Sequence, residues 1–212
     1  MKSQYNRSIP IVATRIIIFG IVLVFVVFLM GLEAGDANIG ETLYQEKSLT
    51  ESMQIMFLLL SAMLFGIIGY RYEDKRSLSI LLVGISLAAF IRELDNFLDH
   101  NVFDGAWQTF VLIDILIVGF FTYRLRATLK EAILEFMNHP AFGMVVSGFL
   151  VVFVFSRMYG RKSFWKAVMA ENYSRSVKNL AEEGIELLGY ALIFLGILEF
   201  FMYCMKKKNE VV

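Results

Sequence analysis

Residues 16–32 read IIIFGIVLVFVVFLMGL, an apolar run with no charged side chain. A bilayer core of about 30 Å is crossed by roughly 20 helical residues, each rising about 1.5 Å. This run therefore predicts a membrane-spanning helix. Basic residues precede it, as they do in a secretory signal, but the apolar core is long for one. We expect a span that is not cleaved.

Five further apolar runs lie at 53–70, 78–98, 107–123, 141–155 and 185–203. The chain is 58% hydrophobic and only 19% charged, whereas a soluble domain carries about 25% charged residues. Lipid gives a bare backbone no hydrogen-bond partner, so each run should be helical. We predict an all-α, polytopic transmembrane six-helix bundle that forms one integral membrane domain over residues 1–212. Apolar residues at helical spacing predict an amphipathic interfacial helix at about 163–180.

Basic residues predict the orientation, because cytoplasmic loops are enriched in Lys and Arg. They cluster before the first run, after the second, after the fourth and after the sixth: Lys2, Arg7, Arg15, Arg71, Lys75, Arg76, Arg124, Arg126, Lys130, Lys206, Lys207 and Lys208. We therefore expect cytoplasmic N- and C-termini, in a bacterial cytoplasmic membrane. The loop before the last run is also basic and opposes this rule. We interpret it as a surface for anionic lipids on the interfacial helix.

Charged residues also occur inside the predicted spans. The third run ends with polar side chains that a helical wheel places on one face, and the sixth opens with glutamates. An ionised group at the bilayer centre costs about 2.5–3.5 kcal/mol, so such groups are functional candidates. They predict an outward-facing ligand site formed by Arg92, Glu93, Asp95, Asn96, Asp99, Asp114, Arg157, Glu183 and Glu186.

Carboxylates outnumber arginines in this set, which indicates a cation, a cationic ligand or shared protons. The only histidines, His100 and His139, are predicted on opposite membrane faces, which excludes multi-histidine zinc and a bis-histidine haem. A divalent cation such as Mg, Mn or Ca is the candidate cofactor. Its candidate ligands are Asp95, Asp99, His100, Glu183 and Glu186.

Other classes of function are excluded by what the sequence lacks. Cys204 is the only cysteine, so iron–sulfur clusters and intrachain disulfides are excluded. There is no Gly-rich phosphate loop for a nucleotide, and a net charge of zero gives no field for nucleic acid.

Three functions fit these observations. The first is a membrane protein that binds a cation or small polar solute at the outward site, with transport as an extension. The second is a membrane-embedded, divalent-metal-dependent enzyme acting on an outer-leaflet lipid. The third is a structural or accessory subunit, in which the charges hold helices together or meet a membrane protein partner or a second copy of the chain.

Overall fold

The computed structural model describes the backbone of residues 2–36 and 49–209 and the side chains of residues 12–32 and 49–207. Within these ranges the chain is helical and has no strand. Its elements are α1 (Lys2–Asp36), α2 (Leu49–Arg71), η1 (Glu73–Lys75), α3 (Arg76–Glu93), α4 (Asp95–Asn101), α5 (Ala106–Arg124), α6 (Arg126–Met137), α7 (Pro140–Leu150), η2 (Val151–Phe155), α8 (Ser156–Tyr159), α9 (Lys162–Met169), η3 (Ala170–Asn172) and α10 (Arg175–Asn209). Three of the basic residues used to predict the orientation, Lys2, Arg7 and Lys208, have side chains that lie outside the described residues.

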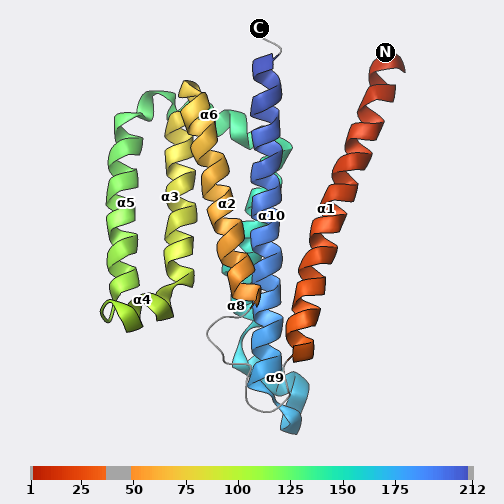
Figure 1. Cartoon of the computed structure of the whole chain (residues 1–212), viewed down its shortest axis with the longest axis vertical. Coiled ribbons are helices and arrows are strands. Elements are labelled where there is room, and N and C mark those ends of the chain that lie inside the picture. The colour runs from red at the N-terminus through yellow and green to blue at the C-terminus, as the bar shows by residue number, and fades with distance from the viewer. Residues whose placement is uncertain (1, 37–48, 210–212) are drawn as a thin grey trace.

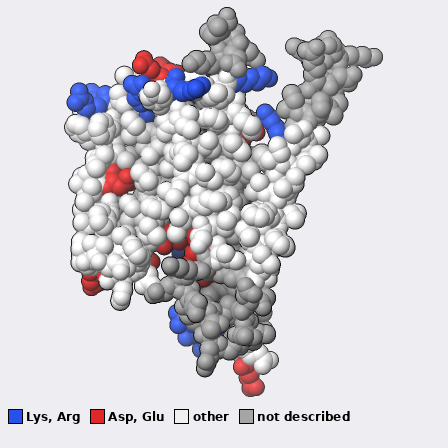
Figure 2. Space-filling model, viewed as in Figure 1, with Lys and Arg blue, Asp and Glu red and all other residues white. Residues whose placement is uncertain are grey.

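The described helices form a membrane-type bundle. Five of them are long and apolar enough to cross a membrane, and the bent pair α3 and α4 makes a sixth. This confirms the predicted class, a helical bundle with up to six spans. Figure 2 shows a largely uncharged belt across the molecule, interrupted by small acidic patches, with Lys and Arg side chains concentrated at one end and a smaller group at the other.

Helix α10 is the centre of the bundle (Figure 1). It packs against α2 and α7, and α1 contacts it from the other side. On the far side of α2 come α3 and then α5, which packs mainly on α3 and forms the edge of the bundle. Both ends of the chain lie with η1 and α6 at one end of the bundle, called the terminal end. The opposite end, with α4, α8 and α9, is called the α4 end.

Glycines set the close approach of α7 to α10. A Cβ added to Gly148 would lie 2.5 Å from the carbonyl oxygen of Gly189. The two backbones are therefore too close for any side chain larger than the hydrogen of glycine. Small residues allow this kind of close helix packing in membranes, where apolar burial gives helices little reason to associate. Around this contact, Leu187 and Leu195 of α10 and Val152 of η2 are fully buried.

An ion pair joins the first span to the last. Nη1 of Arg15 in α1 lies 2.8 Å from Oε1 of Glu199 in α10, and the Glu199 side chain is only 8% exposed. Val26 is the only buried residue of α1 among those described, and Val22 and Met30 pack beside it on the same core cluster. The ion pair and this apolar contact together hold α1 against α10.

Two of the predicted helices end differently in the structure. The third span was expected to be continuous over 78–98, but α3 ends at Glu93 and α4 turns away from it by 64°. The break lies at Leu94, where the backbone leaves the helical region (φ −99°, ψ 15°). Oδ1 of Asp95 accepts a hydrogen bond from the backbone N–H of Asn96 at 2.6 Å. Short polar side chains of this kind compete with helix propagation.

The segment 163–180, expected to be one interfacial helix, is divided. Helix α9 stops at Met169, and Ala170 has φ 47°, a left-handed conformation that a helix cannot continue through. Residues from Arg175 onward already belong to α10. The final span is therefore longer than the predicted 185–203.

A lysine is buried at the terminal end, in a stretch that the sequence predicts only as a basic loop between two spans. Lys75 is 3% exposed, and its Nζ lies 2.7 Å from Asp74 and 2.9 Å from Glu135. The other oxygen of Glu135 accepts from Lys207 at 3.0 Å. Glu135 of α6 therefore links η1 to the end of α10. Burial raises the pKa of Glu135, but its bonds to the two lysines outweigh this and hold the pKa below the ordinary 4.5.

This lowered pKa predicts an acid-sensitive terminal end. A carboxylate with a depressed folded pKa contributes stability above its ordinary pKa and loses it as the pH falls through the folded value. We expect Glu135→Gln to lower the unfolding free energy by about 1–2 kcal/mol at neutral pH and to flatten the loss of stability between about pH 5 and pH 3. Thermal unfolding in detergent across this pH range measures both the unfolding free energy and its pH dependence.

Glu131→Gln, at an exposed position of α6, is the control. Parallel pH profiles for Glu135→Gln and the wild type would contradict the assignment.

Candidate functional site

A polar pocket of about 290 Å³ opens at the α4 end of the bundle. We call it the acidic pocket. Its walls come from α2, the junction of α3 and α4, α8, and the first turns of α10. It is lined by Glu51, Gln54, Arg92, Glu93, Asp95, Arg157, Asn179, Glu182, Glu183 and Glu186. Six carboxylates thus share the pocket with two guanidinium groups, so negative charge is in excess.

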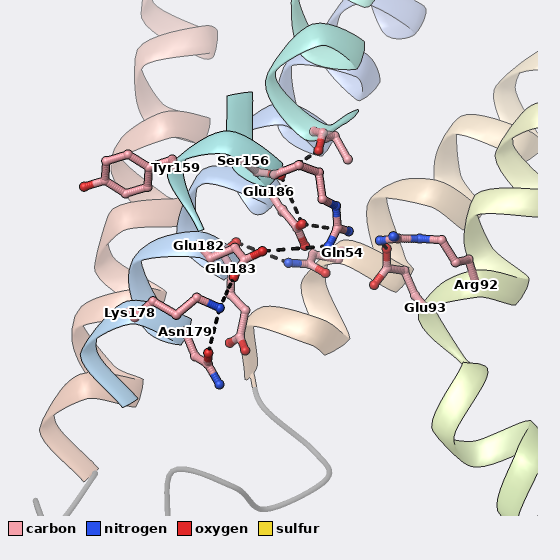
Figure 3. Close-up of polar contacts among 12 residues, drawn as sticks. Gln54, Arg92, Glu93, Ser156, Tyr159, Lys178, Asn179, Glu182, Glu183 and Glu186 are labelled. Carbon is pink, nitrogen blue, oxygen red and sulfur yellow. Dashed lines mark hydrogen bonds and ion pairs between the residues drawn. The ribbon is translucent and has the colours of Figure 1, made fainter. Parts of the chain in front are cut away.

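One side of the acidic pocket is built around Glu186, whose side chain is 9% exposed (Figure 3). Its Oε1 lies 3.0 Å from Nη2 of Arg157 and 3.1 Å from the Ser156 hydroxyl. That hydroxyl also lies 2.6 Å from the carbonyl oxygen of Val152, so it shares one proton between two acceptors. Glu186 is therefore held in place by α8 before any ligand arrives.

The mouth of the acidic pocket carries a second ion pair. Nζ of Lys178 lies 2.5 Å from Oε2 of Glu182, one helical turn along α10. Arg157 also approaches Glu182, at 3.8 Å. Nearby, the Gln54 side chain donates to the backbone carbonyl of Glu183 at 3.2 Å and ties α2 to α10. Figure 3 shows these groups converging from α2, α8 and α10.

The opposite side of the acidic pocket is a three-residue network. Oε1 of Glu93 accepts from Nη2 of Arg92 at 2.7 Å and from the hydroxyl of Tyr190 at 2.7 Å. Tyr190 is 1% exposed, so its hydroxyl has been taken out of solvent entirely. Nε of Arg92 is buried without a hydrogen-bond partner among the described residues. The network joins α3 to α10 at this side of the pocket.

A π-helical turn precedes the residues that α8 contributes. The span that begins at Pro140 runs through η2 and reaches Tyr159, beyond the predicted end at 155. Its widened turn at Val151–Phe155 rotates the residues that follow, and π-turns of this kind occur often at functional sites. Ser156 and Arg157 come directly after it and both contact Glu186.

The structure brings together six of the nine predicted ligand-binding residues, namely Arg92, Glu93, Asp95, Arg157, Glu183 and Glu186. Of the other three, Asn96 is exposed on α4 and Asp99 lies on the same helix, outside the acidic pocket. Asp114 lines a separate groove between α3 and α5. The bend at Leu94 explains why Asn96 and Asp99 lie outside the acidic pocket. A helical wheel assumes a straight helix, and a straight helix would place both residues beside Arg92.

The predicted site lacked four lining residues, Glu51, Gln54, Asn179 and Glu182. Glu51 and Gln54 carried a usable signal, because they lie about one turn apart on the same stripe of α2. Glu182 pairs with Lys178 and Arg157 in the structure.

The five candidate metal ligands are not gathered at one point. Asp95, Glu183 and Glu186 line the acidic pocket, whereas Asp99 and His100 lie on α4 outside it. Among the described residues, no group of three or more His, Cys, Asp or Glu side chains is placed to hold a metal ion. The carboxylates of the pocket are instead spread around its walls and interleaved with arginines.

No protein-family model, curated protein or solved structure matches this chain. The charge, size and exposed groups of the acidic pocket are therefore the grounds on which a function can be proposed.

Proposed function

We propose that this protein is an integral membrane protein that binds a small organic cation in the acidic pocket. The supporting observation is the pocket itself, where six carboxylates and two guanidinium groups surround about 290 Å³. Arg92, Arg157 and Lys178 pair with carboxylates of the walls. The six carboxylates still outnumber these three cations, which leaves a negative field for a positively charged ligand. An ammonium group has three donors that can be shared among several acceptors.

An organic cation suits this arrangement better than a bare metal ion. Magnesium needs oxygen ligands at about 2.0–2.1 Å in near-octahedral geometry, and calcium needs six to eight oxygens at about 2.3–2.6 Å. The carboxylates of the pocket are dispersed, and Glu93 and Glu186 are already bound by arginines. Ammonium–carboxylate contacts of about 2.7–2.9 Å tolerate such spacing.

We propose further that the pocket faces away from the cytoplasm of a bacterium. Lys and Arg side chains concentrate at the terminal end (Figure 2), and the positive-inside rule would put that end in the cytoplasm. Below the pocket, Leu187, Tyr190 and Val152 fill the bundle with buried side chains. We therefore propose binding at the outer face rather than passage of the ligand through the bundle.

Calorimetry on the protein in phosphatidylcholine nanodiscs tests this function, with putrescine, ethanolamine and MgCl₂ as separate probes. We expect the amines to bind and Glu183→Gln to weaken them by about tenfold or more, since a charged hydrogen bond is worth about 1.5–3 kcal/mol. The matched control is Glu131→Gln, at an exposed position of α6 at the terminal end. Failure of both amines to bind, or equal binding by Glu183→Gln, would overturn the proposal. Magnesium binding that displaces the amines would overturn the choice of an organic cation.

A further inference from the structure

An apolar groove of about 750 Å³ runs between α3 and α5, a size usual for a bound small molecule. Leu81, Ile85, Val111, Ile115 and Phe153 line it. Because α5 is the edge helix and packs mainly on α3, this groove faces the lipid.

Glycines give the α3–α5 groove its depth. A Cβ on Gly84 would collide with Val118, so α3 and α5 touch at this level. Gly119 also lines the groove, and a Cβ added there would meet nothing within 4 Å. A hydrocarbon chain could therefore lie over Gly119 without displacing any side chain.

Arg92 lines both the α3–α5 groove and the acidic pocket. Only its Nη2 is taken by Glu93, while its buried Nε has no hydrogen-bond partner among the described residues. Guanidinium groups are well suited to phosphate because their N–H groups form a planar fork. Arg92 is therefore a hydrogen-bond donor suited to an anion, and it lies where the apolar groove meets the acidic pocket.

A second polar group, Asp114, lies deeper in the groove. Val118 lies opposite Gly84, and α3 and α5 are antiparallel (Figure 1). Counting about 1.5 Å of rise per residue from this contact puts Arg92 about 12 Å and Asp114 about 6 Å toward the α4 end. The structure shows no hydrogen bond or ion pair of Asp114 to any described residue. Unpaired carboxyl groups at membrane depth are expected to meet a partner.

We propose that the ligand of the acidic pocket is the head group of a single-chain aminophospholipid, lysophosphatidylethanolamine. This inference rests on the proposed function. The order of groups along the site is apolar groove, carboxyl of Asp114, guanidinium of Arg92, and carboxylates of the acidic pocket. The order of groups along the lipid is hydrocarbon chain, glycerol hydroxyl, phosphate and primary ammonium. Each polar group of the lipid meets a complementary group of the protein.

The complementarity also excludes close relatives of this lipid. A choline head group carries no N–H to donate to the carboxylates, and a glycerol head group carries no positive charge. A second acyl chain would remove the free hydroxyl that donates to Asp114. The site is therefore expected to prefer the lysophosphatidylethanolamine form over its choline, glycerol and two-chain counterparts.

Native mass spectrometry of the protein in phosphatidylcholine nanodiscs tests this preference with four added lipids of equal chain length. These are lysophosphatidylethanolamine, lysophosphatidylcholine, lysophosphatidylglycerol and phosphatidylethanolamine. We expect the first to be retained about 10- to 100-fold better than the others, the ratio that corresponds to one charged hydrogen bond. Equal retention of all four would mean ordinary annular lipid and would overturn the inference.

Gly119→Leu tests the groove without disturbing the acidic pocket. The added side chain enters open space beside the groove, so the protein should fold and lysolipid retention should fall about tenfold. Gly20→Leu on α1, also in open space, is the matched control and should retain the lipid. Undiminished retention by Gly119→Leu would overturn the inference.

The two proposals fail separately. If putrescine binds the wild type and Gly119→Leu alike while no lysolipid preference is seen, the lipid inference is wrong and the organic-cation site stands. If neither amine binds, the proposed function itself is wrong.

Discussion

Replacing Gly148 with alanine is expected to destabilise the protein more than any other single methyl addition in α7. The new Cβ would lie 2.5 Å from the Gly189 carbonyl oxygen and 2.7 Å from the Ile193 side chain. Backbone cannot rotate away as a side chain can, so α7 must separate from α10. Overpacking by one methyl group costs about 1–3 kcal/mol, and we expect the upper end of that range here.

Gly143→Ala provides the control for this experiment, because it lies in the same helix and its added Cβ would meet nothing within 4 Å. It should leave stability unchanged or raise it by up to about 1 kcal/mol, since alanine is a better helix former than glycine. Thermal or denaturant unfolding in the same detergent compares the two variants. Equal stabilities would show that α7 and α10 do not approach as closely as described.

Replacing Glu93 with alanine is expected to affect both stability and binding. Glu93 is 13% exposed and holds both Arg92 and Tyr190. Breaking a buried ion pair costs about 3–5 kcal/mol. Arg92 is 31% exposed, so partial screening reduces the expected loss to about 2–3 kcal/mol. The freed guanidinium would also cancel negative charge in the acidic pocket, and amine affinity should fall about tenfold.

Glu93→Gln separates the two effects. Its amide oxygen can still accept from the Tyr190 hydroxyl, so the loss of stability should be smaller than with alanine. The charge is gone in both variants, so the loss of amine affinity should be similar. Unfolding measurements and calorimetry on the same preparations give both quantities. Destabilised variants that bind amines as tightly as the wild type would favour the accessory-subunit hypothesis, in which these charges only hold helices together.

Much of the fold could be predicted because the membrane restricts what a chain can do. A long apolar run must be helical in lipid, so the runs at 53–70 and 107–123 correspond closely to α2 and α5. The convergence of Glu183 and Glu186 with Arg92 and Arg157 was also predictable. Charged side chains avoid hydrocarbon, and the ends of antiparallel neighbours offer them a common place to meet.

The remaining features depend on local backbone geometry and on packing, which hydropathy does not record. The bend at Leu94 places Asp99 and His100 outside the site, and hydropathy gives no sign of it. Burial of Lys75 depends on α6 folding over η1. In the sequence, the same lysine looks like one more solvated positive charge between two spans. The α3–α5 groove arises because α5 has few neighbours, which no single segment reveals.

The pairing of Arg15 with Glu199 also bears on how the protein is made. Translation delivers α1 to the membrane before α10 has left the ribosome, so Arg15 reaches the membrane while its carboxylate partner, Glu199, is still unsynthesised. The ion pair can form only after the last helix has been made, so the first helix reaches its final place in the bundle late.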